Sequence, residues 1–382
     1  MKRQFIREIL DVITADTISF AGGLPDADLF PLDAFKTAAD RVLSEPASLQ
    51  YSRSQGYAPL REKIARRYCA AGFETRAEEI LITTGSQQAI NLIALSMLPY
   101  GVTVELPAYL GALSAFRLAK VKTEGVALEH DGIAMTPFRR SIARTGAAYL
   151  IPDFQNPTGL RYSAAKRQAV AKAVLDADAL LIEDAPYSEL YFDHASLPIS
   201  ASMPERSFHL GSFSKILAPG LRVGWVRASE ANLRRLLVVK EAIDLHTSTL
   251  DQRLIDAFWE TEGLDRHLSS LRIHYRAKKN ALSNALRTQL PDFVFDEPRG
   301  GMFLYGRLPG HDTKSLVNRC LERGVAFVPG SEFYPGTPAL DELRLNFTHT
   351  DPAQMHRGVG LMADAYREQI VSKITGVARA TA

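Results

Sequence analysis

The stretch Ser212-Phe-Ser-Lys-Ile-Leu-Ala-Pro-Gly-Leu-Arg-Val-Gly-Trp225 contains the residues around which the rest of the chain is organised. The apolar residues 207–210 precede it and are typical of the end of a buried strand. A Pro-Gly turn separates Lys215 from Arg222. A lysine, unlike an arginine, can lose its proton and attack a carbonyl carbon to form a Schiff base. Because Ser212 and Arg222 suit an anion, the stretch predicts a lysine nucleophile beside an anion site.

A lysine in such a short pattern can also be an ordinary surface residue beside a loop arginine. Composition and the other motifs must therefore distinguish between a nucleophile and a surface lysine. The chain has 382 residues, of which 46% are hydrophobic and 23% are charged, as in ordinary globular proteins. Its net charge of +2 favours neither a nucleic acid nor a membrane surface as partner. We also find no signal segment and no apolar stretch long enough to span a bilayer. Cys69, Cys320 and the histidines form no metal or redox motif, which predicts reduced thiols, no metal and a cytoplasmic location.

Short apolar strands alternate with helices through the first two thirds of the chain. The predicted strands are residues 80–84, 102–105, 147–151 and 179–184, with a helix over 89–97 among the segments between them. This alternation predicts an α/β fold with a mostly parallel sheet covered by helices on both faces. Strands at 293–295, 302–305, 325–330 and 343–347 predict a second, smaller α+β domain. We therefore expect an N-terminal arm and part of the small domain in 1–45, a large domain in 46–290 and the small domain in 291–382.

Residues that suit pyridoxal phosphate (PLP) follow the predicted strands, at the edge where open α/β sheets bind ligands. The phosphate could be bound by backbone N–H groups of Ser86 and Gln87, with Ser86 near the N-cap of a helix, and by Ser212 and Arg222. A carboxylate must keep the pyridine nitrogen protonated, and Asp184 ends a strand. A helix cap is the alternative role for these strand-end acids, more so for Glu183 than for Asp184.

The remaining parts of such a site also have candidates in the sequence. Asn156 and Tyr187 could donate hydrogen bonds to the ring hydroxyl oxygen, and Tyr109 could stack on the ring. Arg344 could bind the α-carboxylate of an amino acid with both arms of its guanidinium. The pair Gly22-Gly23 permits close approach of a bound group, although a simple turn is an equal alternative.

These motifs resemble, in order and over nearly the whole chain, the class I and II aminotransferases of PLP fold type I. Within them the similarity is greatest to the group of 2-aminoadipate, aromatic and kynurenine aminotransferases. The matching segments are Phe20-Ala-Gly-Gly-Leu-Pro25, Gln50-Tyr-Ser52, Gly56-Tyr-Ala-Pro-Leu-Arg61, Thr84-Gly-Ser-Gln-Gln88, Pro107-Ala-Tyr109, Gln155-Asn-Pro-Thr-Gly159, Glu183-Asp-Ala-Pro-Tyr187, Ser212-Phe-Ser-Lys215, Pro219-Gly-Leu-Arg222 and Arg344-Leu-Asn-Phe347.

The resemblance implies a ping-pong transaminase that uses Lys215 as its catalytic lysine and 2-oxoglutarate as the acceptor. It also implies a homodimer with shared active sites, in which Tyr51 reaches the phosphate of the neighbouring subunit's cofactor. Gly23 and Asn156 are expected at the substrate, and Arg7, on a mobile arm, is expected to bind a distal carboxylate. A solvated Arg7 paired with Glu8 or Asp11 is the alternative for that residue.

Two other functions fit the same motifs. The first is another reaction of the same cofactor, as in a β-lyase, a decarboxylase or an oxidase that acts on an amino acid. The second is an effector-sensing domain, as in bacterial regulators that carry this module behind a winged helix-turn-helix. We expect no DNA-reading domain here, because residues 5–7 already belong to the module. Arg53 departs from the family pattern and is expected at the surface.

Overall fold

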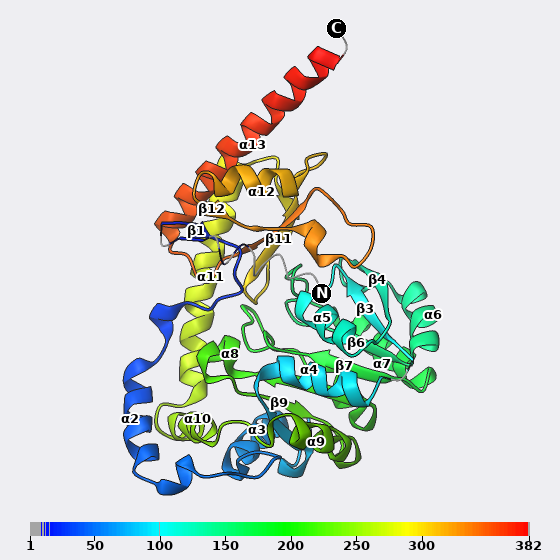
Figure 1. The fold of residues 1–382 in the computed structure, drawn as a ribbon, viewed down its shortest axis with the longest axis vertical. Coiled ribbons are helices and arrows are strands. Elements are labelled where there is room, and N and C mark those ends of the chain that lie inside the picture. The colour runs from blue at the N-terminus through cyan, green and yellow to red at the C-terminus, as the bar shows by residue number, and fades with distance from the viewer. Residues whose placement is uncertain (1–8, 10, 12, 15, 99, 381–382) are drawn as a thin grey trace.

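The computed structural model describes residues 9, 11, 13–14, 16–98 and 100–380 of the chain. Figure 1 shows a large sheet with its helices in the lower half and a smaller sheet with α12 (Thr313–Leu321) and α13 (Pro352–Ala380) in the upper half. The long helix α11 (Leu264–Gln289) runs between the two halves. This architecture confirms the predicted fold class, whereas the exact domain boundaries at residues 45 and 290 stay predictions.

The large sheet has eight strands in the order β2-β9-β8-β7-β6-β3-β4-β5. Their bounds are β2 (Ile80–Thr83), β3 (Val102–Leu106), β4 (Thr123–Glu129), β5 (Gly132–Ile133), β6 (Ala147–Leu150), β7 (Leu180–Asp184), β8 (Ser207–Ser212) and β9 (Gly224–Arg227). The central pairs β3–β4, β3–β6, β6–β7 and β7–β8 are parallel, and β9 runs antiparallel to both β2 and β8. The carboxyl ends of β2, β3, β6, β7 and β8 therefore lie along one edge.

Helices cover both faces of this sheet because successive side chains of each strand point to opposite faces. Ala148 and Leu150 of β6 pack in the core under α6 (Met135–Thr145) and α7 (Ala164–Asp176). Tyr149 lies between them in sequence and packs in the core that contains α4 (Gly85–Ser96) and α5 (Leu110–Leu118). Buried on both faces, these strands consist of nearly continuous apolar runs, as the sequence analysis expected.

Among the described residues, five further helices lie in the lower half of the molecule (Figure 1). They are α2 (Leu32–Leu43), α3 (Ala58–Ala70), α8 (Phe213–Ile216), α9 (Glu230–Asp244) and α10 (Thr249–Thr261). Of these, α2 packs against α10. The amphipathic stretch after residue 229 thus forms three helices, α9, α10 and α11, with breaks at residues 245–248 and 262–263. The expected start of one helix is wrong: α4 begins at Gly85, not at residue 89, with Thr84 as its N-cap, so Ser86 lies near the N-cap, inside the first turn.

The smaller sheet has the order β10-β11-β14-β13, with every neighbouring pair antiparallel. Its strands are β10 (Val294–Phe295), β11 (Phe303–Arg307), β13 (Val328–Pro329) and β14 (Glu342–Asn346). Separately, β1 (Ile18–Ser19) pairs in parallel with β12 (Val325–Ala326). β1, which lies within the predicted N-terminal segment 1–45, therefore packs beside β12. In the described part of the chain, none of the helices has the length and apolar character needed to cross a membrane.

Candidate active site

Most of the predicted site residues gather at the edge where the parallel strands end. Asp184 is the last residue of β7, and Ser212 is the last residue of β8. The loop after β6 carries Asn156, and α4 follows β2 after a single residue. Because β9 is antiparallel, its first residue Gly224 pairs with Ser212, which brings the preceding Arg222 to the same edge. The sheet topology therefore assembles segments that are far apart in the sequence.

Lys215 lies on the short helix α8, directly after β8. Its Nζ donates a hydrogen bond to the carbonyl oxygen of Gly23 at 2.7 Å. Burial, together with the smaller effects of the Arg344 and Arg222 charges, lowers the pKa of Lys215 to about 8. A substantial fraction of the amine is therefore neutral near pH 8, as a nucleophile or a base requires.

Arg222 and the first turn of α4 form a positively charged site, here called the cradle. Gly85 has a φ of +74°, and a Cβ built on it would come within 2.6 Å of Nη2 of Arg222. A Cβ on Gly224 would come within 2.7 Å of the backbone nitrogen of Ser86. Both glycines thus let the arginine and β9 approach the first turn of α4, whose N–H groups have no partner within the helix. This combination of a guanidinium and a helix N-terminus suits a phosphate group.

Two serines lie beside this cradle. Ser212 caps α8, because its hydroxyl oxygen accepts the backbone N–H of Ser214 at 3.2 Å. The hydroxyl oxygen of Ser214 in turn accepts a hydrogen bond from Nη1 of Arg222 at 3.3 Å. Ser212 keeps its own O–H available as a donor. Ser214 was not among the predicted site residues, although the hydroxyl beside Lys215 was a usable signal.

The Asp184 carboxylate has one satisfied and one unsatisfied oxygen. Its Oδ2 accepts the hydroxyl of Tyr149 at 2.5 Å, whereas its buried Oδ1 has no hydrogen-bond partner among the described residues. Burial raises the pKa of Asp184 to about 6. A buried acceptor without a partner is costly unless a ligand supplies the donor. A positively charged N–H group would satisfy Oδ1 and stabilise the ionised carboxylate.

Asn156, Tyr187 and Tyr109 line the neighbouring part of the site. Nδ2 of Asn156 lies 3.4 Å from the Tyr187 hydroxyl. Burial raises the pKa of Tyr187 well above its ordinary value, so its O–H stays protonated and can act as a donor. Tyr109 is the N-cap of α5, and its hydroxyl lies 3.5 Å from Oε1 of Gln87. The structure therefore brings together the neutral donors and the aromatic ring that the sequence analysis expected.

Arg344 is a fully buried guanidinium that comes from the small domain. Its Nη1 donates to Oδ1 of Asn156 at 2.8 Å and its Nη2 to the carbonyl of Ala21 at 2.5 Å. Phe303 and Phe333 pack on it, with ring centroids 4.3 and 5.2 Å from its Cζ. It forms no ion pair with a carboxylate in the described part of the chain, and burial lowers its pKa to about 10. A bound carboxylate would neutralise this charge.

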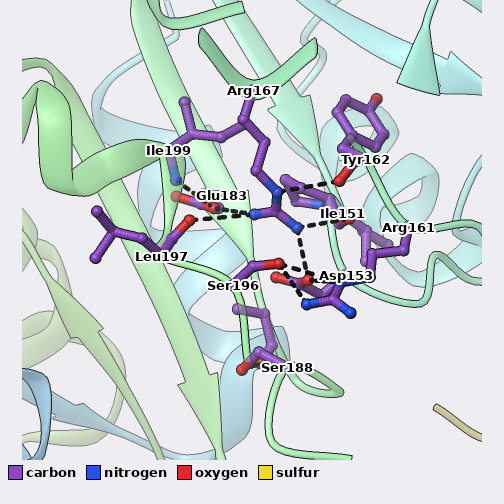
Figure 2. Close-up of polar contacts among 12 residues, drawn as sticks. Ile151, Asp153, Arg161, Tyr162, Arg167, Glu183, Ser188, Ser196, Leu197 and Ile199 are labelled. Atoms are coloured by element: carbon purple, nitrogen blue, oxygen red, sulfur yellow. Dashed lines mark hydrogen bonds and ion pairs between the residues drawn. The ribbon is translucent and has the colours of Figure 1, made fainter. Parts of the chain in front are cut away.

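A buried ion network supports the site from the opposite face of the sheet (Figure 2). Arg167 contacts Asp153 at 2.5 Å and approaches Glu183 at 4.0 Å. Glu183 also accepts, at 3.0 and 2.8 Å, the backbone N–H groups of Ile199 and Ser200, which are the first two residues of the short 3-10 helix at Ile199–Ser202. The network therefore holds the end of β7 and the loop that carries Asn156.

A second buried acid, Glu105, links two of the site loops. Its carboxylate accepts the hydroxyl of Tyr162 at 2.7 Å and Nε2 of Gln155 at 3.2 Å. Gln155 also donates to the carbonyl of Pro107 at 2.9 Å, next to the segment that carries Tyr109. Burial raises the pKa of Glu105 to about 7. The sequence analysis did not select Glu105, although a lone acid within an apolar strand was a usable signal.

Tyr51, a predicted cofactor-binding residue, is not brought into the site of its own chain. The side chain of Tyr51 is 79% exposed, and its ring meets the edge of His246 at a centroid distance of 5.8 Å. Arg53 is also exposed, as expected. Arg7 lies outside the described residues. Gly23 is in the site, because its carbonyl accepts Lys215 and a Cβ there would lie 3.2 Å from Cζ of Phe303.

Comparison with known proteins identifies the family. The family described as aminotransferase class I and II matches residues 15–360. The chain belongs to this family of aminotransferases. The aminotransferase is 38% identical to the 2-aminoadipate transaminase of Thermus thermophilus, covering 95% of this chain and 93% of that protein. It is 34% identical to aromatic-amino-acid aminotransferase 1 of Thermococcus litoralis, covering 97% and 93% of the two chains.

A solved structure extends the comparison to three dimensions. The α-aminoadipate aminotransferase from Thermus thermophilus, complexed with N-(5'-phosphopyridoxyl)-L-leucine, matches with a TM-score of 0.89 and 36% identity. The match covers 97% of this chain and 96% of that one. The aminotransferase is therefore a PLP-dependent transaminase of fold type I. Three features of its site fit the cofactor: Oδ1 of Asp184, which has no partner among the described residues, the basic cradle at α4 and the partly neutral Lys215.

Proposed function

We propose that this enzyme moves the amino group of an L-amino acid to a 2-oxo acid, with 2-oxoglutarate as the acceptor. The observation that carries the proposal is the buried Arg344, which has no carboxylate partner in the described part of the chain and lies close enough to lower the pKa of Lys215. An amino acid or a 2-oxo acid can place its carboxylate on Arg344 and its reacting carbon near Lys215. The same two side chains can therefore serve both halves of a ping-pong reaction.

Each residue of the site has a role in this proposal. When bound, PLP supplies an aldehyde that reacts with amines and a protonated ring that withdraws electron density from the amino-acid α-carbon. Lys215 is the catalytic residue, and its neutral Nζ is the base that takes the α-proton. Asp184 Oδ1 holds the proton on the ring nitrogen, and Asn156 and Tyr187 donate to the ring hydroxyl oxygen. The backbone N–H groups of Ser86 and Gln87, with Ser212 and Arg222, would hold the phosphate, and Tyr109 would pack on the ring.

The experiment that tests the proposed function is a survey of amino donors. Purified enzyme is incubated with single L-amino acids, including 2-aminoadipate, aromatic and branched-chain donors, with and without 2-oxoglutarate. Transamination requires a 2-oxo acid product and an equal amount of glutamate, both of which mass spectrometry can identify. Carbon dioxide, a β-eliminated group or hydrogen peroxide as the stoichiometric product would instead indicate a decarboxylase, a β-lyase or an oxidase.

We further propose a cytoplasmic homodimer with shared active sites. The exposed Tyr51 ring supports this proposal, because it lies outside its own site and is held against His246. The backbone N–H of Ser52 also donates to Nε2 of His246 at 3.4 Å, which orders this segment at the surface. In a dimer, the Tyr51 hydroxyl would add a donor to the phosphate of the neighbouring site.

Replacement of Arg344 tests the carboxylate role. We expect Arg344→Ala to weaken binding of amino acids and 2-oxo acids by about 2–5 kcal/mol, the cost of truncating one partner of a buried charge pair. The loss should appear in the KM of every α-carboxylate substrate and much less in the reaction of a simple amine with the cofactor-loaded protein. Equal losses for amines and amino acids would remove Arg344 from this role.

Arg7 is proposed to bind the distal carboxylate of glutamate, 2-oxoglutarate or 2-aminoadipate. We expect Arg7→Ala to raise the KM for these substrates about tenfold, the scale of one hydrogen bond to a charged group. Leucine or phenylalanine should be little affected, because an apolar side chain does not pair with the guanidinium. Single-turnover kinetics of glutamate and leucine provide the comparison, and the same loss for both would contradict the role.

A further inference from the structure

A buried polar cluster lies behind the start of α4, outside the residues assigned to the cofactor. Lys240 of α9 is fully buried, and its Nζ donates to Oδ1 of Asp244 at 2.7 Å and to the hydroxyl of Thr247 at 3.2 Å. The side chain of Gln88 on α4 lies against both charges. Its Oε1 accepts from Lys240 at 3.2 Å, and its Nε2 donates to Oδ2 of Asp244 at 2.6 Å. The two charges therefore fix the orientation of the Gln88 amide.

The oriented Gln88 amide stabilises the first turn of α4 by a hydrogen bond to the N-cap. Its Oε1 also accepts the backbone N–H of Thr84, the N-cap, at 2.8 Å. This contact is analogous to half of a capping box, in which a side chain within the first turns reaches back to the N-cap nitrogen. The helix start is thus held in place without using the N–H groups of Ser86 and Gln87.

The Thr84 hydroxyl is the second important group. A threonine at an N-cap ordinarily accepts the N–H of the second or third helical residue, which here are Ser86 and Gln87. Thr84 makes no such cap. Its hydroxyl instead donates to Oδ2 of Asp244 at 3.1 Å and lies 3.1 Å from the hydroxyl of Thr247. Asp244 therefore turns the hydroxyl away from the two N–H groups that the proposed function assigns to the phosphate.

We propose that Asp244, oriented by Lys240, is a positioning residue that keeps the N-terminus of α4 uncapped for the cofactor phosphate. The carboxylate accepts the Thr84 hydroxyl and thereby prevents Thr84 from competing with the phosphate for the first N–H groups of the helix. The inference rests on the proposed role of Ser86 and Gln87. It assigns to Asp244 no contact with the cofactor or the substrate.

The test compares two ligands of the apoenzyme that differ only in the phosphate. We expect Asp244→Ala to raise the Kd for PLP about tenfold, the scale of one hydrogen bond to a charged group. The Kd for pyridoxal should change by less than about twofold, because pyridoxal has no phosphate and therefore loses no hydrogen bond to the N–H groups of α4. Titrations followed by cofactor absorbance provide both constants without any measurement of turnover. Asp244→Asn, which keeps the side-chain volume, should show a smaller loss in the same direction.

A double variant isolates the proposed competition. Thr84→Val removes the competing hydroxyl, so Asp244→Ala combined with Thr84→Val should recover PLP affinity relative to Asp244→Ala alone. Asp256→Ala is a matched control, because Asp256 pairs with Lys63 at 2.7 Å in a similarly buried site on α10. The control should leave the ratio of the two Kd values unchanged.

Three results would overturn the inference: equal losses for PLP and pyridoxal, an unchanged Kd for PLP, or no recovery in the double variant. Equal losses would mean that Asp244 only supports the fold. These outcomes are separate from the proposed function, which fails if no amino donor yields a 2-oxo acid and glutamate. If the enzyme catalysed another PLP reaction, Asp244→Ala would still raise the Kd for PLP more than the Kd for pyridoxal.

Discussion

Lys215→Ala is expected to lower transamination about 10⁴-fold, the upper end of the contribution of one positioned acid–base group. The substitution removes the side chain proposed both as the base that takes the α-proton and as the amine that attaches the cofactor. The buried Lys240 cannot replace it: Nζ of Lys215 lies 2.7 Å from Gly23 O inside the site, whereas Lys240 is held behind α4 in its pair with Asp244. The partly neutral state of Lys215 depends on its buried position, which an amine at the surface does not share.

Two measurements check this expectation. Borohydride treatment of the PLP-loaded wild type should add one cofactor mass to the peptide that contains Lys215, and the variant should show no such adduct. Lys215→Arg provides the control for charge, because an arginine keeps the cation but cannot lose its proton near neutral pH. We expect it to be as inactive as the alanine variant. If Lys215→Ala kept its activity and formed a borohydride-reduced adduct at another lysine, the assignment of Lys215 would be wrong.

Asp184→Asn is expected to lower turnover about 10- to 10³-fold, since an adjacent opposite charge shifts a pKa by about 1–3 units. The amide has nearly the same shape, so Tyr149 can still donate to the side-chain oxygen. The position of Oδ1 would then carry an amide N–H group, which cannot accept a hydrogen bond from the protonated ring nitrogen. The ring nitrogen would lose its proton and, with it, most of its capacity to withdraw electrons.

Absorbance and rate measurements on the loaded Asp184→Asn variant test this expectation. Reconstitution with an N-methylated analogue of PLP, whose ring nitrogen carries a fixed positive charge, should restore part of the lost turnover. Glu183→Gln is the matched control, because Glu183 points to the opposite face and accepts the N–H groups of Ile199 and Ser200. This control should reduce stability more than turnover per bound cofactor. Wild-type turnover in Asp184→Asn would exclude Asp184 from the assignment.

The sequence alone was sufficient to predict the α/β fold, the family and most of the candidate residues. Strand and helix patterns are local, with periods of 2 and 3.6 residues, so buried strands such as β6 and β7 can be recognised within a short window. The motif around Lys215 is equally local, because its serines, its lysine and Arg222 all lie within residues 212–222. The start of α4 was predicted four residues too late, since the contact between the backbone N–H of Thr84 and the side chain of Gln88 depends on side-chain orientation rather than on residue type.

Only the tertiary structure decided which charges are paired and which are left for ligands. Lys215 meets Gly23, and Arg344 meets Ala21, across separations of 192 and 323 residues. The unpaired Oδ1 of Asp184 and the Arg344 guanidinium, which lacks a carboxylate partner among the described residues, likewise depend on every segment that packs around them. A local sequence pattern carries no information about such long-range contacts. The physical reason is that desolvation and hydrogen bonding are set by the surroundings of an atom in space, which the chain assembles only when it folds.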